Sequence, residues 1–272
     1  MQSRPIQIRV GYDIVYGTVA PTPMMLMLGV RPERYPDLVT PQLIRTDPIV
    51  PLHQYLDRFG NVCTRLLAPA GAIHLSADFV VQDSGEPDAV APDAQQHPVE
   101  ELPDDTLQFL LASRYCETDL MTQQAWDLFG GTPPGWARVQ AIVAYAHQRI
   151  AFGYHHARNT RTAAQGWEEG VGVCRDYAHL AVTLCRCMNI PARYCTGYLG
   201  DIGVPYAGPM DFSAWFEAYL GGRWYTFDAR HNHPRIGRIM MGYGRDAIDT
   251  ALSTNFGPVS LDRFEVITEQ VG

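Results

Sequence analysis

Apolar residues occupy every second position at two places in the first ninety residues of the chain. Every second position is apolar from Ile6 to Tyr16, and residues 73–81 repeat the pattern. This period is that of a β-strand with one buried face. Residues 24–30 and 62–67 form two further apolar runs, separated by turns that contain Pro and Gly. Residues 1–90 are therefore expected to form a β-sandwich.

The pattern changes between residues 82 and 103, where Asp, Glu, Pro, Ala and Gln dominate and indicate a linker. Helical spacing of apolar residues follows at 107–111, 120–129 and 133–150. We expect Thr132 to cap the last of these and Pro134 to lie in its first turn. Residues 174–188 predict another helix, because apolar residues recur on one face from Tyr177 to Met188.

Strand-like runs end the chain, at 193–199, 214–220, 224–229 and 263–268. Gly221 and Gly222 lie between two of these runs and predict a hairpin turn. Helices followed by an antiparallel sheet are typical of the α+β class. We divide the chain into a β-rich domain (1–90), a linker (91–103) and a second domain (104–272).

Composition excludes several functions. The 272 residues are 46% hydrophobic, enough for a sizeable core, and this excludes a disordered chain. The net charge of −8 disfavours nucleic acid as a partner. All 21 basic residues are Arg. Mechanisms that need a Schiff-base or phosphate-binding Lys are therefore excluded.

Membrane attachment, secretion and cofactor binding are not expected either. Residues 1–9 do not have the pattern of a signal peptide, and no run of 18 apolar residues indicates a membrane span. The six cysteines are irregularly spaced, which favours reduced thiols in the cytoplasm. Cys185 and Cys187 lack the second Cys pair that would complete a metal site, so we predict no metal and no cofactor.

Cys174 is the residue that points most directly to chemistry. It follows Gly-Val-Gly-Val and begins the predicted helix. Unpaired N–H groups and a partial positive charge at a helix N-terminus favour the thiolate, so we expect a lowered pKa and a nucleophilic sulfur. The same N–H groups can bind an oxyanion. Taken alone, a Cys at a helix start favours buried packing over catalysis, since free Cys is among the most buried residue types.

Four segments together carry a resemblance to a known family. They are GVCRDYAHL (172–180), NIPARYCTGY (189–198), AWFEAYL (214–220) and RWYTFDAR (223–230). Their order resembles the transglutaminase-like superfamily, in particular its bacterial branch of candidate cysteine proteases with a β-rich N-terminal region. The resemblance implies a papain-like core that acts on a peptide or protein. It assigns Cys174 as the nucleophile and Asp228 as the acid that orients a catalytic His.

The chain departs from the family at the position of that His. The family's His precedes an Ala-Trp pair, and here Ser213 stands before Ala214 and Trp215. A hydroxyl has no useful basicity near neutral pH. Three explanations remain open: ordinary triad catalysis is lost, another His enters the site, or Ser213 is a subfamily change and the helix terminus alone activates the thiol.

The other histidines can be weighed as replacements. His231 and His233 follow Asp228 closely and could turn back towards it, although a hydrated loop is the simpler interpretation. His155 and His156 are expected at the surface. His179 is expected to point away from Cys174 and to pack into the fold. Adjacent histidines rarely share one ion, so these residues are not expected to form a metal site.

Three neighbouring residues have ordinary structural interpretations. Asp228 could simply cap a turn. Arg175 is expected to pair with an acidic group of the sheet, and Glu217 to face solvent or Arg175.

Two functional hypotheses follow. The first is a cysteine-dependent amide hydrolase or acyl transferase that acts through a thioester. The second is a non-catalytic relative that binds a peptide or protein in the same groove, because Ser213 replaces the usual His. A third class, a metal-binding module, would be tested by metal analysis.

Overall fold

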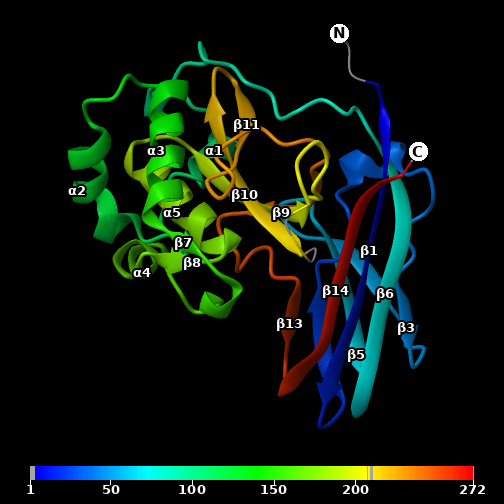
Figure 1. The fold of residues 1–272 in the computed structure, drawn as a ribbon. Coiled ribbons are helices and arrows are strands. Elements are labelled where there is room, and N and C mark those ends of the chain that lie inside the picture. The colour runs from blue at the N-terminus through cyan, green and yellow to red at the C-terminus, as the bar shows by residue number, and fades with distance from the viewer. Residues whose placement is uncertain (1–3, 207, 209–210, 272) are drawn as a thin grey trace.

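Two four-stranded antiparallel sheets form one half of the molecule in the computed structural model, which describes residues 4–206, 208 and 211–271 (Figure 1). The strand orders are β14-β1-β6-β3 and β13-β2-β5-β4. Their strands are β1 (Ile6–Thr18), β2 (Thr22–Leu26), β3 (Arg45–Asp47), β4 (His53–Leu56), β5 (Val62–Ala68), β6 (Gly71–Asp83), β13 (Ser253–Asn255) and β14 (Val259–Val271).

The alternation seen in the sequence buries one face of each sheet. Ile8, Val10 and Ile14 of β1 are completely buried, and so is Met24 of the facing sheet. Side chains from both sheets belong to one apolar core, as expected of a sandwich. The predicted β-sandwich is therefore present.

The last strand of the chain lies in this sandwich and not in the second half. β14 pairs with β1 along nearly its whole length, from Gln7 opposite Val271 to Thr18 opposite Val259. β13 pairs with β2 in the other sheet. The predicted second domain (104–272) is therefore wrong at its C-terminal end. The division near residues 91–103 stays a prediction.

The other half contains the helices and a third antiparallel sheet, of order β11-β10-β9-β12. No helix in the described ranges is long and apolar enough to cross a membrane. The elements are η1 (Pro32–Asp37), η2 (Val99–Glu101), α1 (Asp104–Leu107), α2 (Thr118–Phe129), α3 (Trp136–Arg149), β7 (Ala151–Phe152), η3 (Tyr154–His156), α4 (Ala163–Glu169), β8 (Val171–Gly172), α5 (Cys174–Cys187), β9 (Ala192–Tyr198), β10 (Phe212–Leu220), β11 (Arg223–Phe227) and β12 (Ile239–Gly244).

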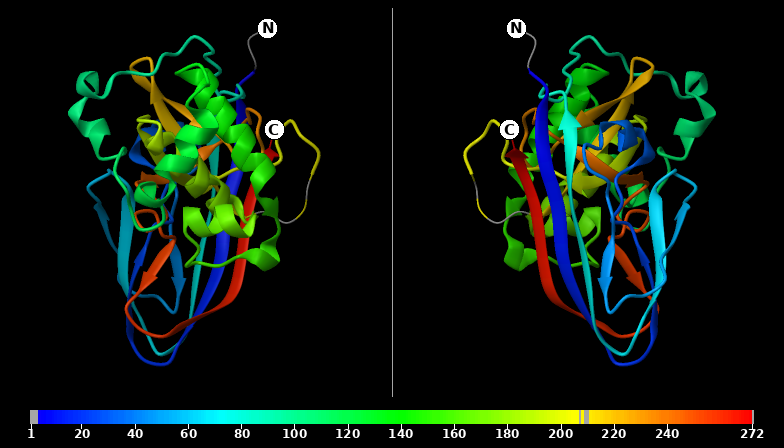
Figure 2. Two further views of the ribbon diagram at one scale, coloured as in Figure 1. Left: turned by 90° about the vertical axis from the view of Figure 1, so that its left-hand side faces the viewer. Right: turned by 90° about the vertical axis from the view of Figure 1, so that its right-hand side faces the viewer.

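The third sheet lies between the helices and the sandwich (Figures 1 and 2). Phe216, Ala218 and Leu220 of β10 pack in the core formed with α5. Elsewhere in the third sheet, Tyr198 of β9 and Ile239 of β12 belong to the core of the sandwich. The two halves are therefore joined through buried apolar side chains, and the fold is the expected α+β arrangement with a papain-like core.

Most predicted elements of this half are present, with two local errors. The helix predicted at 107–111 is wrong, because α1 ends at Leu107 and residues 108–111 form turns and a bend. The helix predicted at 174–188 spans 174–187, and Gly221 and Gly222 form the hairpin turn with φ of 55° and 84°. The predicted cap of α3 is wrong: the helix begins after Gly135, not at Thr132. A Cβ at residue 135 would lie 2.5 Å from the backbone oxygen of Ala94, so this crossing requires glycine.

Candidate active site

Cys174 occupies the first position of α5, and a buried carboxylate holds that end of the helix in place. Asp176 accepts a hydrogen bond from the Val173 N–H at 2.9 Å and one from Arg161 at 3.0 Å. Gly172 permits this approach, because a Cβ there would lie 2.6 Å from the Asp176 Oδ2. The Asp176 carboxylate thus satisfies an N-terminal donor of the helix and complements its dipole.

The sulfur of Cys174 lies against β10. It packs beside Ala178, Tyr194 and Ala214. Burial raises the pKa of the Cys174 thiol to about 11, with smaller opposing contributions from the Arg230 charge and the Ala214 N–H. The predicted lowering of this pKa is therefore wrong, because the cost of burying the thiolate outweighs the helix terminus. The thiol is protonated at neutral pH and needs a base to become a nucleophile.

His231 contacts Asp228, the acid that was predicted to orient a catalytic histidine. The His231 Nδ1 lies 2.8 Å from the Asp228 Oδ2. The other carboxylate oxygen accepts the backbone N–H groups of Arg230 and His231, at 3.0 and 2.9 Å. Asp228 thus caps the turn after β11 and holds the imidazole with the same side chain. An ionised Asp228 requires the proton on Nδ1, so the His231 Nε2 keeps a free lone pair.

Arg238 keeps this carboxylate ionised from its other side. The Arg238 Nη2 donates to the Asp228 Oδ2 at 2.8 Å, and its Nε donates to Asp88 at 2.9 Å. Burial alone would raise the pKa of Asp228. The Arg238 charge and the His231 contacts more than offset that effect, and the pKa lies well below its ordinary value. Nothing in the sequence linked Arg238 or Asp88 to the site.

Ser213 and His231 line the same cavity. This cavity of about 520 Å³, called here the Ser213 cavity, is also bordered by Tyr154, Tyr177 and Arg230. Ser213 is buried, and its hydroxyl has no hydrogen-bond partner within the described part of the chain. The structure therefore brings Ser213, Asp228 and His231 together. Cys174 lies near them at the start of α5, where the charges of Arg230 and Asp228 act on its thiol.

The remaining histidines lie in other settings. The His233 Nδ1 lies 2.7 Å from the backbone oxygen of His231, and the ring borders the Ser213 cavity. His155 and His156 lie on η3, and His155 is exposed. Across residues 4–206, 208 and 211–271, no group of three or more His, Cys, Asp or Glu is placed to hold a metal ion. His231 is thus the histidine placed on the predicted acid.

His179 packs into the fold, as predicted. It is completely buried, and its Nε2 accepts the Ala247 N–H at 3.1 Å. The ring stacks on Tyr115. Burial, with smaller contributions from the Arg175 and Arg186 charges, holds the pKa of His179 well below its ordinary value.

This buried imidazole makes stability depend on pH. Unfolded His titrates near 6.5, so the unfolded state binds more protons than the folded state below that pH. We expect the free energy of unfolding to fall by about 1.4 kcal/mol between pH 7.5 and 5.5 from His179 alone. Urea unfolding at the two pH values measures it. His179→Asn should lose this slope and His53→Asn, at an exposed site, should keep it; an unchanged slope in His179→Asn contradicts the prediction.

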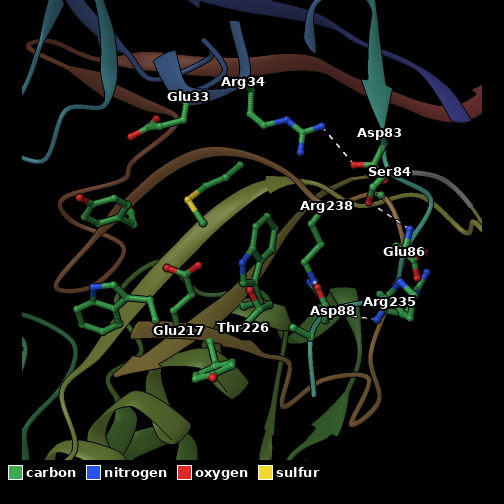
Figure 3. Close-up of a pocket in the computed structure, with 18 of the residues that line it drawn as sticks. Glu33, Arg34, Asp83, Ser84, Glu86, Asp88, Glu217, Thr226, Arg235 and Arg238 are labelled. Carbon is green, nitrogen blue, oxygen red and sulfur yellow. Dashed lines mark hydrogen bonds and ion pairs between the residues drawn. The ribbon is translucent and has the colours of Figure 1, made fainter. Parts of the chain in front are cut away.

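A second, charged cavity of about 500 Å³ lies between the third sheet and the sandwich (Figure 3). Arg238, Asp88 and Arg235 border it together, as the close-up shows. Glu217 also borders this cavity and pairs with Arg193 at 2.5 Å, so the expected contact with solvent or Arg175 is wrong.

Arg175 does not reach the sheet. Its guanidinium donates to the backbone oxygens of Arg158 and Asn159 in the loop before α4. The expected pairing with an acidic group of the sheet is therefore wrong. The side chain instead fastens that loop to the first turn of α5.

The comparisons with known proteins identify relatives of the fold. Residues 123–229 match the model of the transglutaminase-like superfamily. A crystal structure of a candidate cysteine protease from Cytophaga hutchinsonii has a TM-score of 0.87 and 28% identity, covering 100% of this chain and 93% of that one. The protein ML0607 of Mycobacterium leprae, which is described as uncharacterized, is 28% identical over 241 residues, 76% of this chain and 77% of that protein.

The fold and the matched region define a protein with a papain-like, transglutaminase-like domain joined to a β-sandwich. Residues 123–229 are the transglutaminase-like part of the chain.

Proposed function

We propose that this protein is a cysteine-dependent amide hydrolase or acyl transferase that acts on a peptide or protein. Cys174 is the nucleophile, His231 the general base and acid, and Asp228 the residue that orients His231. The observation that carries the proposal is the 2.8 Å contact between His231 and Asp228 at the cavity beside Cys174. Of the three explanations for Ser213, this contact supports a histidine from another position.

The proposed reaction has two steps. The His231 Nε2 takes the Cys174 thiol proton, and the sulfur attacks the amide carbonyl carbon to form a C–S bond. His231 then gives the proton to the leaving amine as the C–N bond breaks, which leaves a thioester. Water or a second amine attacks the thioester, restores the thiol and sets the choice between hydrolysis and transfer. The first N–H groups of α5 are suited to bind the oxyanion.

The raised pKa of Cys174 supports a mechanism in which base and nucleophile act together. A thiol with a pKa of about 11 is almost fully protonated at pH 7. Activation by the helix terminus alone, which was the third explanation, therefore receives no support. An imidazole whose Nδ1 is held by an ionised carboxylate is suited to accept the proton at the moment of attack.

Ser213 has a supporting role in this proposal. Its hydroxyl is buried, borders the cavity and lacks a partner in the described residues. Such a group is available to a polar atom of the substrate, and it is too weakly basic to replace His231. We also propose a cytoplasmic location, which the six free cysteines of the structure support.

Trapping of the thioester tests the proposal. The protein is mixed with p-nitrophenyl acetate and with a panel of acetylated peptide coumarylamides, quenched in acid and analysed by mass spectrometry. We expect an acyl adduct on the peptide that contains Cys174. If no member of the panel acylates Cys174 or is turned over, the enzyme proposal fails. Binding of the same uncleaved peptides, followed by fluorescence polarisation, would then favour the non-catalytic alternative.

A further inference from the structure

Arg230 has an unusual environment among the arginines of the described chain. Among the arginines that are not exposed, all but Arg230 have a carboxylate or a backbone oxygen within hydrogen-bonding distance of the guanidinium. Arg230 has neither in the described residues. It is half-buried and borders the Ser213 cavity. A desolvated cation without an anionic partner is costly, and such groups cluster where a ligand supplies the missing charge.

The position of Arg230 is fixed by its own backbone. Its N–H donates to the Asp228 Oδ1 at 3.0 Å, and its carbonyl oxygen lies 2.9 Å from the His147 Nδ1. The guanidinium lies 4.0 Å from the centre of the Phe152 ring. These contacts hold the side chain on the cavity wall beside the Tyr154 hydroxyl, and most of its N–H donors have no carboxylate or backbone partner among the described residues.

Arg230 also lies close to the reacting sulfur. Burial raises the pKa values of Cys174, Tyr154 and Tyr177, and the Arg230 charge partly offsets that effect at all three groups. Asp211 is the neighbouring carboxylate on the same wall. No ion pair joins Asp211 to Arg230 in the described residues. Burial raises the pKa of Asp211, with smaller opposing contributions from the Phe212 N–H and the Arg230 charge. The guanidinium is therefore open to an anion that enters beside Cys174.

We infer that Arg230 binds a carboxylate of the substrate next to the scissile amide, so that the preferred acyl donors are acidic. This inference rests on the proposed function and names its substrate class: amides of peptides with an acidic residue, or with a free carboxylate, beside the reacting carbonyl. A planar guanidinium binds a carboxylate through two parallel N–H donors. Arg235 also borders the cavity but is already paired with Asp201 at 3.2 Å, so it is not the residue we assign.

Two small alkylating reagents test the inference without a known substrate. Iodoacetate carries a carboxylate on its reacting carbon, and iodoacetamide is its neutral counterpart of nearly equal size. We measure the rates at which both modify Cys174, by mass-spectrometric mapping, in the wild-type protein and in Arg230→Gln. We expect the substitution to lower the iodoacetate rate about 10- to 100-fold, as for loss of a charge-assisted hydrogen bond, and the iodoacetamide rate less than about threefold.

Matched variants separate recognition of the carboxylate from other effects. Arg223→Gln removes an exposed arginine that borders the charged cavity, and it should leave both rates unchanged. Arg230→Lys keeps the charge without the two-pronged donor and should recover part of the iodoacetate rate. Equal losses for both reagents in Arg230→Gln would mean that Arg230 acts on the thiol alone, and this outcome overturns the inference.

Acidic and neutral substrates extend the test. Acetyl-Glu and acetyl-Gln coumarylamides differ only in the side-chain carboxylate. We expect the wild-type protein to prefer the Glu compound at least about tenfold in kcat/KM, and Arg230→Gln to lose that preference. Turnover of both at equal rates overturns the inference and leaves the proposed function intact. Failure of Cys174 to react with either alkylating reagent counts against the proposed function itself.

Discussion

Replacement of Cys174 by alanine is expected to abolish turnover of any substrate that acylates the protein, with a loss of at least about 10⁴-fold in kcat. The reason is that the C–S bond of the thioester cannot form without this sulfur. Initial rates with the best substrate of the coumarylamide panel measure the effect, and thermal melting confirms that the variant is folded.

A second thiol on the same helix provides the control. Cys187 is buried near the far end of α5, where its sulfur lies 3.5 Å from the backbone oxygen of Thr118. Cys187→Ala also removes one thiol from α5, but at a position away from the Ser213 cavity. This substitution should alter kcat less than about threefold. Turnover in Cys174→Ala within tenfold of the wild-type rate would show that another residue is the nucleophile.

The second large effect is expected from His231→Asn. The Asn amide can still donate to Asp228, so the turn is kept while the base is removed. Loss of general acid–base catalysis typically lowers kcat about 10²- to 10⁴-fold. Steady-state kinetics with the best substrate of the coumarylamide panel measure the loss.

Two other substitutions at the Ser213 cavity make this prediction specific. His233→Asn removes an imidazole that borders the same cavity but is not bonded to Asp228. Ser213→Ala removes the hydroxyl at the position of the family's histidine. Each should change kcat less than about tenfold. A larger loss in either variant than in His231→Asn would assign the base elsewhere and contradict the prediction.

The sequence alone was sufficient for the parts of the site that depend on local patterns. Cys174 at a helix start and Asp228 at a strand end follow from the spacing of apolar residues and from the resemblance to a family. The contact between Asp228 and His231 was open to prediction, because an Asp that caps a turn accepts the N–H of the residue three positions on. The hydrated-loop interpretation of His231 missed that the same carboxylate can also bind the ring.

Features that depend on contacts between distant parts of the chain could not be predicted from the sequence. Arg238 joins Asp88 to Asp228 across 150 and 10 residues of sequence, and no local pattern reveals such a bridge. The pKa of Cys174 depends on how completely β10 covers the sulfur, which a helix position does not tell. The last strand was assigned to the wrong half because alternation predicts a strand but does not name its partner.

The pairing of β14 with β1 has a consequence for synthesis on the ribosome. The first strand of the sandwich is made early, whereas the strand that covers one of its edges comes from residues 259–271. After β6 has been made, β1 has only β6 as its neighbour in that sheet. The other edge of β1 keeps unpaired backbone N–H and C=O groups until β14 is made, more than 170 residues later. The sandwich therefore closes after the helices and the third sheet have left the exit tunnel. A stalled or truncated chain would present an unpaired strand edge, where aggregation begins.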